Sequence, residues 1–201
     1  MKWQHSDHHR RSLRLRAYDY SAAAAYFLTL CAHDQECLFG EVADGELSLN
    51  RFGSIASEEW RRSAEVRSEI SLDAFVVMPN HLHGILFVDP IVIVGAHGRA
   101  PLPSRATAPS RLTRPKRSLG SFVAGFKSIV TRRINEVRGT PGKAVWQRNY
   151  FEHIIRNQRS LDAIREYISS NPNNWGKDRE NPAYRETNAV SGEDSKGLPW
   201  I

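Results

Sequence analysis

Two apolar runs, residues 72–78 and 81–88, separated only by Pro79 and Asn80, most strongly constrain the fold of this chain. Runs of this length that are rich in branched and aromatic residues favour β-strands. A Pro-Asn pair between them favours a turn. The sequence therefore predicts that the two runs pair as an antiparallel hairpin at the centre of a sheet.

The second of these strands begins with two histidines separated by one apolar residue, in the order His81, Leu82, His83. Because side chains alternate along a strand, both imidazoles should lie on one face. Taken alone, such a pair is more often structural than a metal site. If it binds metal, two imidazoles with an amide or carboxylate oxygen suit Mn²⁺ or Mg²⁺ better than a closed structural zinc site.

The remaining segments complete an α+β pattern. The sequence predicts a first strand at residues 24–30, a hairpin at 39–49 turning at Asp44-Gly45, a helix at 54–67, a helix at 118–138, a strand at 145–155 and a helix opened by Ser160 as N-cap that ends at about Ser170. This order favours a ferredoxin-like (RRM-like) antiparallel sheet with helices packed on one face, plus a C-terminal helix.

The domain organisation follows from composition. Residues 1–20 are basic and lack apolar periodicity, so we expect a flexible basic arm. Residues 21–178 should form one domain, with a mobile basic insertion at 89–117 where prolines and arginines dominate. Residues 179–201 are expected to form a polar tail.

Positive charge is concentrated in one part of the chain. The net charge is +6, yet no acidic residue occurs between Asp89 and Glu136. This distribution suits a polyanionic partner, although a solvated basic loop and helix face would give the same pattern. The basic residues that we expect to contact such a partner are Arg111, Arg114, Lys116, Arg117, Lys127 and Arg148. Nearby Trp146, Tyr150 and Phe151 could stack on bases or fill the core, and the core is the expectation for Trp146.

The last long helix carries a tyrosine and an amide at positions four residues apart. Tyr167 and Asn171 share one helix face at this spacing, and Pro172 ends the helix. A phenol with a pKa of about 10 is a weak nucleophile at neutral pH unless a metal ion or a base assists it. Each residue also has a structural interpretation, Tyr167 as a packing residue at the core edge and Asn171 as a helix C-terminal residue.

Three blocks of this sequence together resemble the single-tyrosine HUH transposases, and most closely the REP-associated tyrosine transposases. The blocks are residues 76–85 (VVMPNHLHGI), 146–157 (WQRNYFEHIIRN) and 167–172 (YISSNP). They occur in the order and spacing of that family, and the resemblance covers roughly residues 12–176. The basic insertion at 89–117 departs from the family pattern.

The resemblance implies a DNA strand transferase that binds a hairpin in single-stranded DNA and cuts beside it through a 5′-phosphotyrosine intermediate. It makes Tyr167 the nucleophile and His81, His83 and Asn171 the ligands of a Mg²⁺ or Mn²⁺ ion. His153 is a weaker candidate, either for a contact to the phosphate or for a contact to one of the metal-binding side chains. The expected partner is a REP-like hairpin or an insertion-sequence end, bound by a monomer or a homodimer.

Two other functions remain open from the sequence. A non-catalytic nucleic-acid-binding module on an RRM-like sheet would also explain the basic residues and aromatics. A relaxase or replication-initiator nickase shares the same chemistry but usually occupies a longer chain than these 201 residues. With two cysteines that are not a CxxC pair, no signal segment and no long apolar stretch, we expect a cytoplasmic protein without membrane contact.

Overall fold

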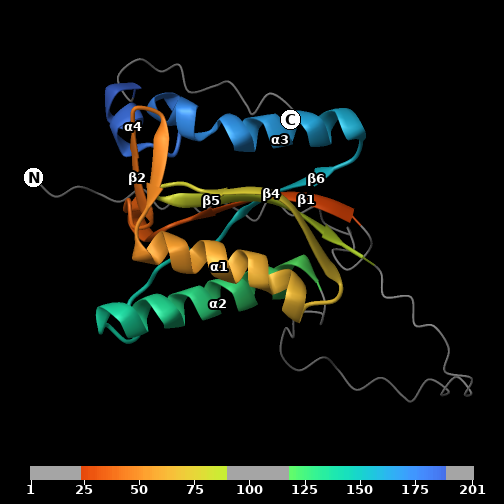
Figure 1. Cartoon of the computed structure of the whole chain (residues 1–201), viewed down its shortest axis with the longest axis horizontal. Helices are drawn as coiled ribbons and strands as arrows, with labels where there is room; N and C mark the ends of the chain where they lie inside the picture. Colours follow the sequence, from red (N-terminus) through yellow and green to blue (C-terminus); the bar gives the residue numbers. More distant parts are fainter. Residues whose placement is uncertain (1–23, 90–117, 189–201) are drawn as a thin grey trace, which may run out of the picture.

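A four-stranded antiparallel sheet forms the centre of the computed structural model, which describes residues 24–89 and 118–188 (Figure 1). Its strands are β1 (Ala24–Cys31), β4 (Ile70–Val77), β5 (His81–Val88) and β6 (Phe151–Ile155), in the spatial order β4-β5-β1-β6. The helices are α1 (Arg51–Val66), α2 (Leu119–Arg138), α3 (Gln158–Ser170) and α4 (Pro182–Asn188). A separate hairpin pairs β2 (Gly40–Ala43) with β3 (Glu46–Leu49).

The topology confirms the predicted α+β class. Along the chain the sheet and its connecting helices run β1-α1-β4-β5-α2-β6, which is the β-α-β-β-α-β order of ferredoxin-like domains. β1 and β4 are parallel to each other and separated by β5, while β5 and β6 are parallel and separated by β1. Each connecting helix thus joins two strands that have a third strand inserted between them.

Helices cover both faces of the sheet. In Figure 1, α1 and α2 lie below the sheet and α3 lies above it. Strand alternation divides the core accordingly. Tyr26, Leu28 and Leu30 of β1 belong to the large cluster between the sheet and helices α1 and α2, whereas Phe27 belongs to the cluster between the sheet and α3. The α3 cluster has only six buried members, so α3 is attached to the sheet by a much smaller apolar contact than the other two helices.

Gly84 makes room for one α1 side chain, Trp60, against β5. A Cβ at this position would lie 2.4 Å from Cζ2 of Trp60, a fully buried α1 side chain. Trp60 in turn makes edge contacts with Phe122 and Phe126 of α2 at ring-centroid distances of 5.5 and 5.3 Å. The glycine after the second histidine therefore lets the tryptophan seat directly against the strand that carries both histidines.

Helix caps decide where the structure differs from the sequence prediction. α1 begins at Arg51 because Asn50 Oδ1 accepts from the amides of Phe52 and Gly53 at 2.8 and 3.0 Å. The prediction that Ser160 caps α3 is wrong, since Asn157 Oδ1 accepts from the Ser160 amide at 2.8 Å. The start of α2 is as predicted, with Ser118 and Ser121 forming a reciprocal capping box.

Three further segments differ in detail from the sequence prediction. The predicted strand at 145–155 contains β6 only from Phe151 onward, preceded by an isolated bridge between Trp146 and Ala32. The predicted central hairpin forms, but β4 is an edge strand. Residues 179–188 were predicted as polar tail, yet Asn80 Nδ2 donates to the Glu180 carbonyl at 2.6 Å and α4 follows.

The predicted arm (1–20), nearly all of the insertion (89–117) and the tail beyond residue 188 lie outside the described residues. Within the described ranges, no helix combines the length and apolar character needed to cross a membrane.

Candidate metal centre and tyrosine

Both histidines project from β5 onto the face of the sheet that α3 covers. His81 is fully buried and His83 is 3% exposed, and their ring centroids lie 4.3 Å apart. The register pairs His83 with Thr29 and His81 with Cys31 of β1. The predicted co-facial arrangement of the two imidazoles is therefore present, at the start of a strand that is paired on both sides.

Hydrogen bonds at the Nδ1 atoms determine which nitrogen of each ring faces the site. Asn80 Nδ2 donates to the carbonyls of Gln35 and Glu180, so Asn80 Oδ1 is the atom that lies 2.9 Å from His81 Nδ1. Because an amide oxygen only accepts, His81 carries its proton on Nδ1 and has a lone pair on Nε2. Thr29 Oγ1 lies 2.9 Å from His83 Nδ1 and can hold that ring in the same orientation.

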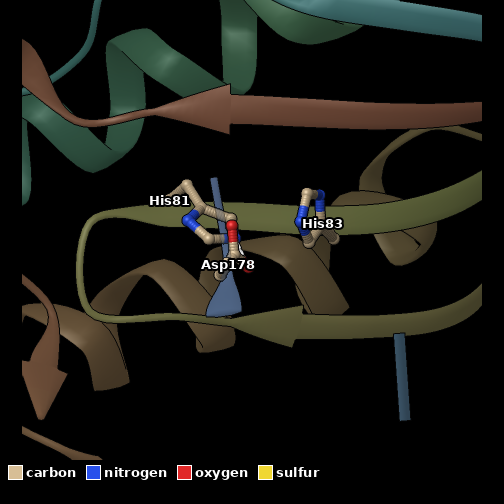
Figure 2. Close-up of side chains that lie close together, drawn as sticks. All are labelled: His81, His83 and Asp178. Atoms are coloured by element: carbon tan, nitrogen blue, oxygen red, sulfur yellow. Dashed lines mark ion pairs between the residues drawn. The ribbon is translucent and has the colours of Figure 1, made fainter. Parts of the chain in front are cut away.

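Asp178 completes a cluster that sequence reasoning missed. Its carboxylate Oδ2 lies 3.9 Å from His81 Nε2, and ligand atoms of His81, His83 and Asp178 all lie within 4.8 Å of one another (Figure 2). A short 3-10 segment, η2 (Pro172–Lys177), brings Asp178 back over the histidines after α3 ends. Its other oxygen, Oδ1, accepts from the Glu180 amide at 2.7 Å, which orients Oδ2 toward the imidazoles.

These donors fit a divalent cation. His81 Nε2, Asp178 Oδ2 and Asn171 Oδ1 are all buried and have no hydrogen-bond partner among the described residues. Burial lowers the pKa of His81 to about 3, so its Nε2 is unprotonated at neutral pH and cannot form an ion pair with Asp178. Two acceptors facing each other without a donor are unfavourable, whereas a shared cation would satisfy both. Ligands bound at about 2.1 Å in octahedral geometry lie about 3 Å apart when adjacent and about 4.2 Å apart when opposite, and the 3.9 Å between His81 Nε2 and Asp178 Oδ2 falls between these values.

Tyr167 reaches the same site from α3. Its hydroxyl oxygen lies 3.3 Å from His83 Nε2, and the two ring centroids are 5.2 Å apart. Phe27 supports both rings, stacking on His83 at 5.3 Å and contacting Tyr167 edge-on at 6.1 Å. The phenol of the last long helix therefore lies beside the paired imidazoles within one chain.

The electrostatics of the site keep the phenol protonated when no cation is bound. Burial raises the pKa of Tyr167 above its usual value, and the negative charges of Asp178 and Glu180 raise it further. A hydrogen bond from the Asn171 side chain acts in the opposite direction and lowers this pKa. Burial and then the neighbouring His81 hold the pKa of His83 well below its usual range.

An ion pair and a β-bulge fix α3 over the sheet. The pairing of β4 with β5 shifts between Leu72 and Phe75, so Asp73 leaves the regular ladder. The Asp73 carboxylate accepts from Arg165 Nη2 at 2.6 Å and from Arg165 Nε at 3.1 Å. Because Arg165 lies two residues before Tyr167, this contact constrains the helix at the turn that presents the phenol.

The other predicted site residues that the structure describes are His153, Lys127 and Arg148. His153 sits on β6 opposite Phe27 and is half-buried. Lys127 Nζ donates to the carbonyls of Gln147 and Asn149, and Arg148 is exposed. Arg111, Arg114, Lys116 and Arg117 lie outside the described residues. Trp146 is buried against Phe39 and Phe126, as expected for a core residue.

Comparisons with known proteins place this site in context. No family model matches the chain. A Haemophilus influenzae protein described as uncharacterized is 40% identical over 181 residues, which are 89% of this chain and 96% of that protein. The solved structure of a REP-associated tyrosine transposase bound to a REP hairpin matches with a TM-score of 0.53 and 18% identity, over 83% of this chain and 75% of the other. This likeness supports a shared fold. A transposase candidate from Deinococcus radiodurans R1 matches more weakly, with a TM-score of 0.42 and 17% identity, over 78% and 95% of the two chains.

Proposed function

This chain belongs to the same family as the Haemophilus influenzae protein, and we propose that it is a metal-dependent tyrosine transposase that cleaves and rejoins single-stranded DNA beside a hairpin. The observation that carries this proposal is the position of the Tyr167 hydroxyl, 3.3 Å from His83 Nε2 and beside buried acceptors that lack donors. A phenol held next to a cation-binding set has the composition of a phosphoryl-transfer site.

His81, His83 and Asp178, together with the Asn171 oxygen, would hold Mg²⁺ or Mn²⁺. Nitrogen and oxygen donors without a thiolate suit these ions, and coordination sites left over would admit water and phosphate oxygens. When bound, such an ion neutralises phosphate charge, orients the phosphorus and offsets the anionic field of Asp178 on the phenol. Asp178 is an addition to the ligand set expected from the sequence.

Tyr167 is the proposed nucleophile. Its oxygen forms a bond to phosphorus as the bond from phosphorus to the 3′ oxygen breaks, which leaves a 5′-phosphotyrosine and a free 3′ hydroxyl. The phenol loses one proton and the departing 3′ oxygen gains one, so the exchange needs neither water nor a nucleotide cofactor. The reverse attack by a 3′ hydroxyl rejoins a strand and restores the phenol. Phe27 and the Asp73–Arg165 contact hold the phenol in place during both steps.

A hairpin in single-stranded DNA, REP-like or from an insertion-sequence end, is the proposed substrate. The solved transposase of similar fold is bound to a REP hairpin. The basic residues between Asp89 and Glu136, with Arg148, supply the positive charge that such a substrate requires. Binding by a monomer or a homodimer is compatible with a tyrosine and histidines that meet within one chain.

The non-catalytic alternative is less well supported by the packing. RRM-type modules bind bases on an exposed sheet face. Here α1 and α2 cover one face of the sheet and α3 covers the other (Figure 1). The residues on the α3 face that would meet a base are instead a buried histidine pair and the ring of Phe27.

The proposal is tested by incubating the protein with a hairpin oligonucleotide carrying single-stranded flanks, with Mn²⁺, Mg²⁺ or EDTA. We expect metal-dependent cleavage and a covalent adduct that survives denaturation. Tyr167→Phe should abolish both, while Tyr184→Phe, which removes a phenol from α4, should leave both unchanged. Undiminished cleavage by Tyr167→Phe would refute the assigned nucleophile, and reversible binding without any cleavage would favour the binding-module alternative.

A further inference from the structure

An open groove lies between α2 and the segment that leads into β6. It has a volume of about 390 Å³, and besides Gln147 its polar lining residues are Lys127, Ser128, Thr131, Lys143 and Arg148. No acidic residue lines it. We call these five residues the α2 groove. Three cations and two hydroxyls without an opposing carboxylate form a surface that is complementary to phosphodiester oxygens.

Lys127 is the part of the α2 groove that most clearly lacks an anion. Its ammonium donates to the carbonyls of Gln147 and Asn149, both at 2.8 Å, which leaves one of its three protons uncommitted in these bonds. Burial lowers the pKa of Lys127 to about 8, and no carboxylate among the described residues pairs with it. An anion in the groove would compensate this desolvated charge.

The α2 groove opens beside the end of the sheet that carries the metal-site residues. Its wall includes Trp146 and Gln147; Trp146 forms a bridge with Ala32, and the Gln147 amide donates to the Cys31 carbonyl at 3.0 Å. Cys31 is in turn the register partner of His81. Two strand spacings, roughly 10 Å, therefore separate this wall from the backbone of the first histidine. Because α2 and the histidine side chains lie on opposite faces of the sheet, a DNA strand that joins the groove to the site would pass round this end of the sheet over several nucleotides.

We propose that the α2 groove binds the sugar-phosphate backbone of the single-stranded flank whose scissile phosphate lies at Tyr167, an inference that rests on the proposed function. Lys143 and Arg148 are exposed and make the phosphate contacts, while Ser128 and Thr131 offer hydroxyl donors. Lys127 binds the carbonyls of Gln147 and Asn149 and so fixes the wall of the groove, and its ammonium adds a positive charge. The buried Trp146 supports the wall and does not stack on a base.

The test is equilibrium binding of a labelled hairpin with single-stranded flanks, measured in EDTA over a range of salt concentrations. Each single-strand phosphate contact contributes a slope of about 0.7 in log K against log salt, so two contacts strengthen binding about 25-fold between 1 M and 0.1 M salt. We therefore expect the double variant Lys143→Ala/Arg148→Ala to bind about 25-fold more weakly than wild type at 0.1 M salt. The slope itself should fall by about 1.4. Both side chains are exposed, so the thermal midpoint should stay within the range of surface substitutions.

The matched control is Arg51→Ala/Arg62→Ala, which removes the same charge from two exposed positions of α1 that do not line the groove. We expect it to change affinity much less than the groove variant does. Equal losses in the two double variants, or no loss in the groove variant, would overturn the proposal. So would an equal loss for a blunt hairpin without flanks, because the groove would then bind duplex. Since binding is measured without metal, a failure to detect cleavage would count against the proposed function and not against the groove.

Discussion

The unpartnered Asp178 carboxylate leads to a prediction that links stability to metal binding. Asp178 Oδ2 faces the lone pair of His81 Nε2 at 3.9 Å, and both atoms are buried without donors. In Asp178→Asn, Oδ1 can still accept from the Glu180 amide while the new Nδ2 takes the place of Oδ2 and donates to His81 Nε2. An unsatisfied buried polar group costs about 1 to 3 kcal/mol, so satisfying this pair should stabilise the ion-free protein by about 2 kcal/mol.

That gain should appear as a rise in the thermal midpoint. For a chain of this size, 1 kcal/mol corresponds to roughly 2 to 4 °C, so Asp178→Asn should melt roughly 4 to 8 °C higher than wild type in EDTA. With Mn²⁺ the order should change. A ligand at 100 times its Kd stabilises the folded state by about 2.7 kcal/mol, and the wild type should gain this increment while the variant loses most of it. Calorimetry or circular dichroism in both conditions measures the two effects.

Asp89→Asn is the control, because it removes the same charge from a carboxylate that bonds Ser71 near the surface. Its melting should stay close to wild type in EDTA, and it should retain the full Mn²⁺ increment. The reasoning is refuted if Asp178→Asn is less stable than wild type without metal, or if it responds to Mn²⁺ as strongly as wild type does.

Three further predictions follow from the fold and the site. The pKa values of His81 and His83 are lowered by folding, so the unfolded state binds more protons than the folded state below about pH 6.5. The free energy of unfolding should therefore be unaffected above that pH and should fall by up to about 1.4 kcal/mol per pH unit per histidine as the pH drops toward 5. Urea unfolding in EDTA should show a shallower decline for His81→Gln than for wild type. Gly84→Ala should destabilise by about 1 to 3 kcal/mol because its methyl group meets Trp60, whereas Gly125→Ala on α2, with nothing within 4 Å, should stabilise by up to about 1 kcal/mol; the opposite order in chemical denaturation would contradict the packing account. Asp73→Asn weakens the contact that fixes α3, so single-turnover cleavage should slow while metal-free DNA affinity is unchanged, and a parallel loss of both would argue against a positioning role.

The sequence predicted the site elements that depend on local periodicity. His81 and His83 share a face because strand alternation is local, and Tyr167 and Asn171 share a face because helix periodicity is local. The meeting of those two pairs depends instead on which face of the sheet α3 covers, and for that the family resemblance was needed. The element order was enough to give the ferredoxin-like class, since few topologies accommodate it.

Asp178 could not be identified in the same way. It lies between Lys177 and Arg179, in a charged stretch that is typical of solvent-exposed chain. Its burial results from η2, which turns the backbone after Pro172 and brings residues 178–180 against Asn80 and Gln35. These contacts span 100 and 145 residues of sequence, and no local pattern encodes them. The signal that could have been noticed is Asn80 itself, an amide placed just before the paired histidines with no role in the strand.

Lys127 shows the limit of charge patterns. Its place in the basic stretch suggested a DNA contact, and a count of charges cannot distinguish an exposed cation from one whose ammonium holds a loop. The carbonyls of Gln147 and Asn149 that Lys127 binds are backbone groups without any sequence signature. Similarly, the caps at Asn50 and Asn157 compete with nearby serines, and the sequence does not show which side chain reaches the amides.

The central claim is that the Tyr167 oxygen attacks a DNA phosphate at a metal site built from His81, His83 and Asp178. The most direct measurement is mass spectrometry of the protein after reaction with a hairpin oligonucleotide and Mn²⁺, followed by digestion with trypsin. Cleavage after Arg165 and Lys177 isolates Tyr167 in the peptide of residues 166–177, where it is the sole tyrosine. The account predicts a phospho-oligonucleotide mass on that peptide in wild type and its loss in EDTA. An adduct on a different tyrosine, or cleavage without any protein-linked DNA, would contradict it.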